Sequence, residues 1–402
     1  MLGTDTSSGE RDPSVGQAPT RPWQIGMVAG EASGDTQGAY LVEELKRRDP
    51  SLHIAGVGAR RMREAGVEIL RDCTGLAAMG FVETWRKVPY GIGVYRLMCR
   101  RVEQRLVDLL ILIDFGVINL RLGRYALRHG CPVLIYFPPA SWSSDRAKLR
   151  DVARSATRIA TPFPQSARGL AAEGADVTFV GHPLLEKLGP VVKRRQELHQ
   201  TKQDTIIALL PGSRDHEITY ILPPMLKAAR LIATQIPQAR FLVSVAQTVE
   251  RERLAGLVEA AGINASLLDG TEVPLEQADV GIVTSGTATL EAAIVGLPMV
   301  VVYRAGWMQY LHYLLFCWPR VDPFAMPNIL AGHKIVPEMV QRRATPEAMA
   351  EHALRFLRDA ELRERTGRQL QEVAARLDAG GAVSKTADIV FDMLRQYAGE
   401  RA

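Results

Sequence analysis

The segment DVGIVTSGTATLEAAIVGLPMVVVYR, Asp279–Arg304, contains residue types that suit the binding of a diphosphate. We expect an apolar strand over Val280–Val283, then a turn of small residues, and then a helix. A turn of this kind leaves backbone N–H groups free at one point, where the helix dipole adds partial positive charge. Glu291, one turn into the helix, can accept hydrogen bonds from ribose hydroxyls. The residues predicted to bind the diphosphate are Ser285, Gly286, Thr287 and Ala288.

A second strand, turn and helix is predicted around LLPGSR, Leu209–Arg214. Gly212 and Ser213 allow the backbone to approach a phosphate, and Arg214 can donate two hydrogen bonds to its oxygens. Glu217, three residues later, can orient Arg214. An ordinary helix N-terminus with an exposed arginine is the alternative, but two such turns in one half of the chain favour a phosphate site.

The motif AGEASGD, Ala29–Asp35, follows the first predicted strand. Gly30 allows a close turn there, and Ser33 or Asp35 can cap the helix that comes next. The spacing is not GxGxxG, so no dinucleotide-binding site is predicted. Helix capping alone is one interpretation. The other places Gly30, Glu31 and Ser33 beside a bound sugar.

A general base is predicted at the end of the apolar strand Leu109–Ile113. Asp114 follows this strand, and a carboxylate at the mouth of a parallel sheet faces the cleft partly desolvated, with a raised pKa. A helix or turn cap is the alternative role. His182, in the motif GHP, follows another strand and either faces the cleft or closes a turn. We predict Asp114 as the base, with Asp35 and His182 as the alternatives.

The motif MPNILAG, Met326–Gly332, predicts a loop that runs into a helix. Asn328 is placed to contact the base or the phosphate of a nucleotide. Glu338 and Gln341 are predicted to lie one turn apart on the following helix, and Gln341 is counted among the binding residues.

Short apolar strands alternate with helical patterns in two series, separated by a charged linker at Lys187–Gln203. Continuous apolar strands between helices predict parallel sheets that are covered on both faces. We therefore predict an α/β fold with two doubly wound, Rossmann-like domains that face a central cleft at the carboxyl ends of their strands. The predicted boundaries are a disordered extension at 1–21, domains at 22–190 and 204–375, and a C-terminal helix at 376–402 that returns to the first domain.

The composition is that of a globular protein, with 402 residues, 47% of them hydrophobic and 23% charged, and a formal charge of +5. No apolar run approaches the ~20 residues of a membrane span. The four cysteines have no CxxC spacing, so no metal site is predicted, and the basic residues match no nucleic-acid-binding motif. Two aromatic-rich segments, Met79–Arg105 and Trp307–Trp318, are candidates for contact with a membrane or acyl chains, and packing in the core is the alternative.

Together these motifs resemble the lipid-A-disaccharide synthase family in order and spacing, over about residues 24–395. The most specific parts are LLPGSR and SGTATLE. The resemblance implies a GT-B fold and an inverting glycosyl transfer that needs no metal or other cofactor. The implied donor is UDP-2,3-diacylglucosamine, and the implied acceptor is 2,3-diacylglucosamine 1-phosphate (lipid X). It also implies a cytoplasmic protein bound peripherally to a Gram-negative inner membrane, and a homodimer is a further prediction.

The sequence departs from the family pattern in two places. The strand-end motif IDxPDFN is IDFGVIN here, Ile113–Asn119, and the SPSVWAW loop is PPASWSS, Pro138–Ser144. Both changes fall on the predicted acceptor side, whereas the motifs on the UDP side are intact. The alternatives are another GT-B enzyme that acts on a UDP-hexosamine, such as a 2-epimerase or another lipid glycosyltransferase, and a non-catalytic relative that binds a UDP-sugar.

Overall fold

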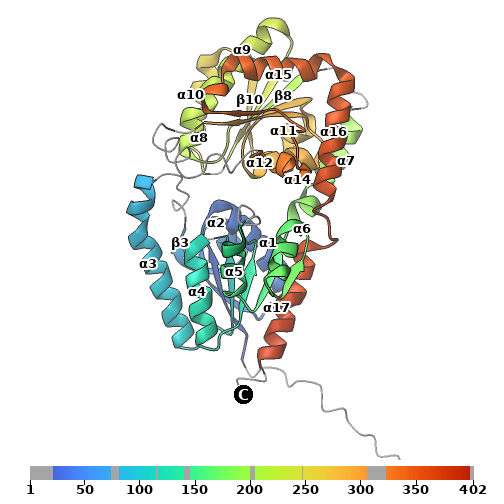
Figure 1. Ribbon diagram of the computed structural model, residues 1–402. Helices are drawn as coiled ribbons and strands as arrows, with labels where there is room; N and C mark the ends of the chain where they lie inside the picture. The colour runs from blue at the N-terminus through green and yellow to red at the C-terminus, as the bar shows by residue number, and fades with distance from the viewer. Residues whose placement is uncertain are drawn as a thin grey trace, which may run out of the picture.

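The computed structural model contains two parallel sheets, each with helices on both faces, in two lobes (Figure 1). The predicted α/β architecture of two doubly wound halves is confirmed. The predicted extension at 1–21, apart from Arg21, and the segment Trp307–Trp318 lie outside the described residues. The structure describes residues 21–73, 81–114, 116–139, 145–199, 204–246, 248–304, 306 and 323–398.

The first sheet has seven strands in the order β3-β2-β1-β4-β5-β6-β7, and all neighbours are parallel. The strand β4, LLILI, is buried at every position because helices cover both of its faces. Ala29 at the end of β1 pairs with Ile113 at the end of β4, so Gly30 and Asp114 follow at the same edge. The strands are β1 Gln24–Ala29, β2 His53–Gly58, β3 Glu68–Asp72, β4 Leu109–Ile113, β5 Val133–Tyr136, β6 Arg158–Thr161 and β7 Val177–Phe179.

Two different groups of helices cover the first sheet (Figure 1). The C-terminal helix α17, Ala382–Ala398, packs beside α1, Ala32–Arg48, in one core cluster, which confirms its predicted return to this half. The opposite face is covered by α3 to α6. The helices that accompany this sheet are α2 Arg60–Glu64, α3 Phe81–Glu103, α4 Gly116–Arg128, α5 Arg146–Ala153 and α6 Pro164–Ala172.

The second sheet has six strands in the order β10-β9-β8-β11-β12-β13, again all parallel. Leu210 of β8 pairs with Val283 of β11, so the two predicted phosphate-binding turns leave the sheet side by side. The strands are β8 Ile206–Leu210, β9 Arg240–Val245, β10 Ala265–Asp269, β11 Val280–Thr284, β12 Met299–Tyr303 and β13 Glu338–Val340.

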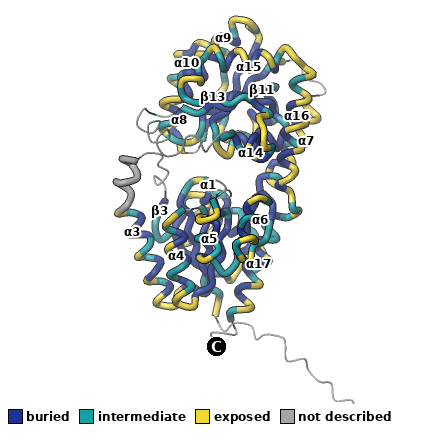
Figure 2. The backbone as a smooth tube through the Cα atoms, in the orientation of Figure 1, coloured by how far each residue is buried: buried dark blue, intermediate teal, exposed yellow. Residues whose placement is uncertain are grey.

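Alternate residues of these strands point into two cores, and Figure 2 shows the strands of both sheets as mostly buried backbone beneath partly exposed helices. One core joins the sheet to α8 Asp215–Tyr220, α9 Leu222–Gln235, α10 Arg251–Ala261 and α15 Pro346–Arg358. The other joins it to α7 Pro183–His199, α11 Glu272–Gln277, α12 Thr287–Ile294, α14 Met326–Ala331 and α16 Ala360–Ala375.

Several local predictions were wrong. The sequence analysis did not predict β3 or β13, which are edge strands of their sheets. Glu338 opens β13, and Gln341 begins a 3₁₀ turn, Gln341–Arg343, so the two residues do not share a helix. Where the structure describes the chain, no helix has both the length and the apolar character that crossing a bilayer requires.

Candidate active site

The turn after β11 presents free backbone N–H groups to the cleft edge of the second sheet. Gly286 occupies the N-cap position of α12, and the Thr289 hydroxyl donates to its carbonyl at 2.8 Å. The N–H groups of Gly286, Thr287 and Ala288 have no acceptor among the described residues. Free N–H groups at a helix start bind anions. Ser285 does not contribute in this way, because its N–H donates to the Val302 carbonyl at 3.0 Å in the sheet.

Glu291 lies one turn into α12 and is partly buried. Its Oε2 accepts a hydrogen bond from the Thr271 hydroxyl at 2.7 Å. Burial raises the pKa of the Glu291 carboxyl, the Thr271 hydrogen bond opposes this shift, and the charge of Glu272 adds to it. The sequence analysis did not single out Thr271, because it is distant in sequence and only the fold brings it to Glu291.

The turn after β8 has its N–H groups already occupied. Glu217 Oε2 accepts from the N–H of Ser213 at 2.8 Å and from the N–H of Arg214 at 3.1 Å. Gly212 has φ +108°, and a Cβ at this position would lie 2.1 Å from Glu217 Oε2. The N–H groups of Ser213 and Arg214 therefore bind Glu217 and not a phosphate in this structure, whereas the approach of a phosphate to Gly212 stays a prediction.

The Arg214 side chain reaches across the cleft instead. Its Nη2 lies 3.0 Å from Glu31 Oε2 at the start of α1, and its Nη1 lies 3.5 Å from Glu217 Oε1. The Arg214 side chain is 28% exposed and the Glu31 side chain 40%. Arg214 thus ion-pairs with a carboxylate from each half, and, because a guanidinium has five donors, these contacts do not use all of its N–H groups.

Asp114 lies directly after β4 in a left-handed backbone conformation, φ +34°. Phe137, directly after the neighbouring strand β5, also has a positive φ, +57°. Left-handed backbone at a non-glycine residue is strained and is characteristic of functional sites. Two such residues at adjacent strand ends mark this edge as the candidate active site.

Charged groups from both halves of the chain influence the pKa of Asp114. The pKa of its carboxyl is raised to about 6, chiefly by burial; the charge of Glu31 contributes to this rise, and the charge of Arg214 opposes it. Asn119, on α4, is buried and lines the same small pocket. Its Nδ2 donates to the Ile113 carbonyl at 3.3 Å, whereas its Oδ1 is buried with no partner among the described residues. The sequence analysis named Asn119 only as the last residue of the altered motif IDFGVIN.

The two alternative bases have structural roles. Asp35 is buried, and its carboxylate accepts from the N–H groups of Ala59 at 2.6 Å, Arg61 at 2.9 Å and Met62 at 3.2 Å, which caps α2. His182 is also buried, and its Nδ1 accepts from the Leu184 N–H at 3.2 Å at the start of α7.

Burial lowers the pKa of His182 to about 3. The Nδ1 lone pair of His182 and the carboxylate of Asp35 both accept backbone N–H groups, which favours Asp114 over either of them as the base.

Asn328 is corrected as well. It is fully buried in α14, and its Nδ2 donates to the Val336 carbonyl and to Glu338 Oε1, each at 2.9 Å. Its Oδ1 accepts from the N–H groups of Ile335 at 2.7 Å and Val336 at 3.1 Å. A carboxamide has two donors and two acceptor lone pairs, so Asn328 has none left for a nucleotide.

The remaining predicted residues lie at the cleft edges of the sheets. Gly30 is buried between β1 and α1, and Ser33 is partly buried in the first turn of α1. Gln341 follows β13 with φ +54° and is partly buried. In the described ranges, no group of three or more His, Cys, Asp or Glu side chains is arranged so that it could hold a metal ion.

Comparisons with known proteins address the chain as a whole. A family model described as lipid-A-disaccharide synthetase matches residues 25–387. The lipid-A-disaccharide synthase of Anaeromyxobacter dehalogenans strain 2CP-C is 37% identical over 376 residues, which cover 92% of this chain and 98% of that protein.

Two solved structures share the fold at low identity. The UDP-GlcNAc 2-epimerase from Neisseria meningitidis bound to UDP-GlcNAc aligns with a TM-score of 0.55 at 13% identity, covering 92% of this chain and 99% of that one. The glycotransferase of kitacinnamycin aligns with a TM-score of 0.59 at 16% identity, covering 93% and 99%. At these identities the likeness shows the fold alone, which is the GT-B arrangement.

Proposed function

Because this chain belongs to the lipid-A-disaccharide synthetase family, it is a glycosyltransferase of lipid A biosynthesis, and we propose that its reaction takes place where Asp114, Glu31 and Arg214 meet. The reaction transfers 2,3-diacylglucosamine from UDP-2,3-diacylglucosamine to the 6-hydroxyl of 2,3-diacylglucosamine 1-phosphate. It forms the β-1,6-linked disaccharide 1-phosphate and UDP. The observation that supports this site best is the 3.0 Å contact between Arg214 and Glu31 beside Asp114.

We propose that the second half of the chain binds the UDP part of the donor. The free N–H groups of Gly286, Thr287 and Ala288 hold one phosphate, and the Arg214 guanidinium holds the other. Glu291 accepts hydrogen bonds from the ribose hydroxyls, and Thr271 fixes the position of its carboxylate. These donors stabilise the negative charge that develops on the departing UDP.

Asp114 is the proposed general base on the other side of the cleft. It takes the proton of the acceptor hydroxyl while the hydroxyl oxygen forms a bond to the anomeric carbon and the bond to UDP breaks. A carboxyl with a pKa of about 6 is ionised at neutral pH and is a stronger base than an exposed carboxylate. The Oδ1 of Asn119, which has no partner among the described residues, lines the same pocket as Asp114 and is a candidate for positioning the acceptor.

The proposed roles of the two halves also suggest the domain boundaries and the location of the protein. We propose that 22–190 is the acceptor-side domain, that 204–375 is the UDP-side domain, and that 376–402 secures the first of these. Because donor and acceptor are lipids, we also propose peripheral binding to the cytoplasmic face of the inner membrane. A homodimer remains a proposal, which sedimentation of the purified chain would test.

The deciding experiment incubates the purified chain with UDP-2,3-diacylglucosamine and lipid X in detergent, followed by mass spectrometry of the lipids. We expect the disaccharide 1-phosphate and an equal amount of UDP. Release of free or rearranged hexosamine without the acceptor would identify an epimerase instead. Binding of the UDP-sugar without turnover, with lipid X present, would identify a non-catalytic relative.

A further inference from the structure

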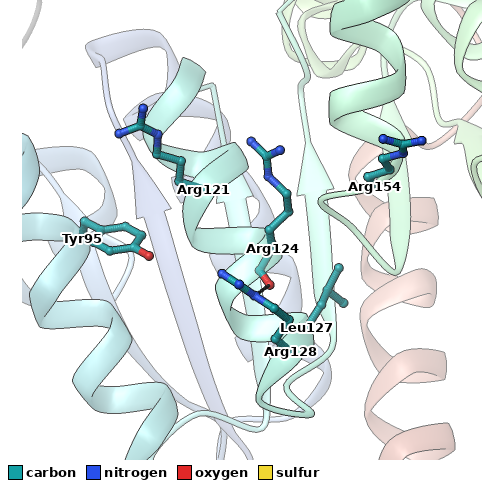
Figure 3. Close-up of a pocket in the computed structure, with 6 residues that line it drawn as sticks. All are labelled: Tyr95, Arg121, Arg124, Leu127, Arg128 and Arg154. Atoms are coloured by element: carbon teal, nitrogen blue, oxygen red, sulfur yellow. Dashed lines mark hydrogen bonds between the residues drawn. The ribbon is translucent and has the colours of Figure 1, made fainter.

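A basic surface pocket of about 510 Å³ lies in the first half of the chain (Figure 3). We call it the arginine pocket. It is formed between α3, α4 and the end of α5. The residues that line it are Tyr95, Arg121, Arg124, Leu127, Arg128 and Arg154.

Three of the four arginines share one face of α4, because residues 121, 124 and 128 are spaced i, i+3 and i+7. Arg154 comes from the residue after α5, and Tyr95 directs its hydroxyl toward α4 from α3, as Figure 3 shows. Like charges at this spacing repel one another and weaken a helix. The four side chains therefore concentrate positive charge at a cost to the fold, which an anionic ligand would offset.

Little of this charge is neutralised by the residues that the structure describes. Arg124 Nη1 lies 3.6 Å from Asp151 Oδ1, and Asp151 is the only carboxylate that forms an ion pair with any of the four arginines in the described ranges. Arg124 and Arg128 each donate their Nε–H to a backbone carbonyl of α4, which leaves their terminal NH₂ groups for a ligand.

The pKa of the Tyr95 phenol is raised, chiefly by burial and by its hydrogen bond with Cys99, and the charges of Arg128 and Arg121 oppose this shift.

The surroundings of the arginine pocket are apolar on the side of the cleft. Ile92, one turn before Tyr95 on α3, is 45% exposed, and Val117, one turn before Arg121 on α4, is 57% exposed. Both belong to the few large hydrophobic side chains that are exposed in the described part of the chain. Exposed apolar residues beside clustered arginines are characteristic of a surface that contacts anionic lipid.

Most of the arginine pocket lies away from Asp114. Asp114 precedes α4, and Arg121, Arg124 and Arg128 lie about 8, 12 and 18 Å along this helix from its first residue at 1.5 Å per residue. An anion bound between Arg124 and Arg128 is thus a second ligand, not the sugar whose hydroxyl Asp114 deprotonates.

We propose that the arginine pocket binds the phosphate of an anionic lipid headgroup and so holds the first domain on the membrane with the cleft entrance beside it. Arg124, which lies between the other arginines of the pocket in Figure 3, binds the phosphate together with its neighbours, and Ile92 and Val117 meet the lipid surface next to it. This inference rests on the proposed function only in one respect: the lipid substrates explain why the protein would bind a membrane. The binding itself is independent of catalysis and can be measured without any sugar substrate.

The test is sedimentation of the full chain with phosphatidylcholine vesicles, with and without a fraction of phosphatidylglycerol, at low ionic strength. We expect binding to the anionic vesicles only. Arg121→Gln with Arg124→Gln should weaken it by about 10-fold or more, since each basic residue near an anionic surface contributes measurably. Unchanged binding by this double variant would overturn the proposal.

The matched control is Arg365→Gln with Arg368→Gln on α16. These exposed arginines have the same i, i+3 spacing, and Arg368 forms one surface ion pair with Glu364 at 3.7 Å, as Arg124 does with Asp151. The control removes the same charge and should keep vesicle binding within about twofold. An equal loss in both variants would show that net charge alone drives binding, which would overturn the assignment to this pocket.

Inorganic phosphate separates a lipid ligand from a soluble one. A soluble ligand is indicated by two results together. Inorganic phosphate would raise the melting temperature of the wild type but not of the Arg121/Arg124 variant, and vesicle binding would not depend on these arginines. The lipid assignment would then be wrong. Transfer assayed in detergent should be unchanged in the variant. A wild type that binds vesicles through these arginines but makes no disaccharide would refute the proposed function and leave the pocket assignment intact.

Discussion

The two sides of the cleft present opposite kinds of groups. The second half offers donors, namely the free N–H groups at the start of α12 and the Arg214 guanidinium. The first half offers carboxylates, Glu31 and Asp114, and the pKa of Asp114 is raised to about 6. Donors that are fixed in place bind an anion in the ground state, whereas a carboxylate with a raised pKa moves a proton during the reaction. Binding and proton transfer are therefore separated between the halves, and substitutions on each side should have different kinetic consequences.

The largest effect is expected for Asp114→Asn. Loss of the general base should lower kcat by about 10²- to 10⁴-fold. UDP affinity, measured by calorimetry, should not change, because Asp114 belongs to the acceptor side. Asparagine tolerates the left-handed backbone that φ +34° requires, so the fold should persist.

The stability of the same variant is its internal control. Burial disfavours the ionised form of Asp114 in the folded state, so the wild type is relatively destabilised as pH rises through about 6. At pH 8 the melting temperature of Asp114→Asn should equal or exceed that of the wild type. Full activity in this variant would place the base elsewhere, and a lower melting temperature would contradict the burial argument.

Arg214→Gln should have the converse effect. Removing a charge-assisted contact to the diphosphate should weaken UDP binding by about 2 kcal/mol, or roughly 30-fold in Kd. Isothermal calorimetry with UDP measures this directly. A control is Arg253→Gln, which removes an exposed arginine of α10 that ion-pairs with Asp215 at 3.5 Å in the same half. Equal losses in the two variants would remove Arg214 from the site.

The pH dependence of kcat/KM tests the role of Asp114 through a smaller expected effect. If Asp114 must be ionised, kcat/KM should be level above about pH 6 and should fall about tenfold per pH unit below it. The residual activity of Asp114→Asn should lack this acidic limb. A limb that persists with the same midpoint in the variant would assign the titration to another group.

The strands were predictable because most of them are continuous apolar runs, which appear in a sequence when both faces of a sheet are covered. β4, LLILI, is the clearest case. The two strands that were missed are edge strands with polar ends. Glu68–Asp72, EILRD, is partly exposed, and Glu338–Val340 has only three residues. Their pairing depends on the neighbouring strand more than on their own composition.

The candidate site was less predictable because similar motifs have different contacts. Both turns of the second half place small residues between a strand and a helix. Glu217 occupies the third helical position after Arg214 and binds the free N–H groups of its turn, whereas Thr289 occupies that position after Gly286 and leaves them open. A glutamate at this position is a known capping signal, so this part was accessible from sequence. The partners of Asn328 and Asp35 lie on other elements, and only the fold reveals them.

The smallest effect is expected for Glu31→Gln, which leaves Arg214 without its partner across the cleft. The charge of Glu31 raises the pKa of Asp114, so its removal should lower that pKa and move the acidic limb of kcat/KM to lower pH. Arg214→Gln should move the limb the other way. UDP affinity should rise by a few-fold at most, since a partly exposed ion pair contributes about 1 kcal/mol or less.

A matched control is Glu64→Gln, which removes an exposed carboxylate that pairs with Arg60 at 2.6 Å on α2. It should shift neither the limb nor the affinity. Opposite shifts for Glu31→Gln and Arg214→Gln would mean that one carboxyl group senses both halves of the chain, and this requires the cleft to be closed as the structure has it. If neither substitution moves the limb, Asp114 does not feel Arg214 in solution, and the two sides of the cleft act independently.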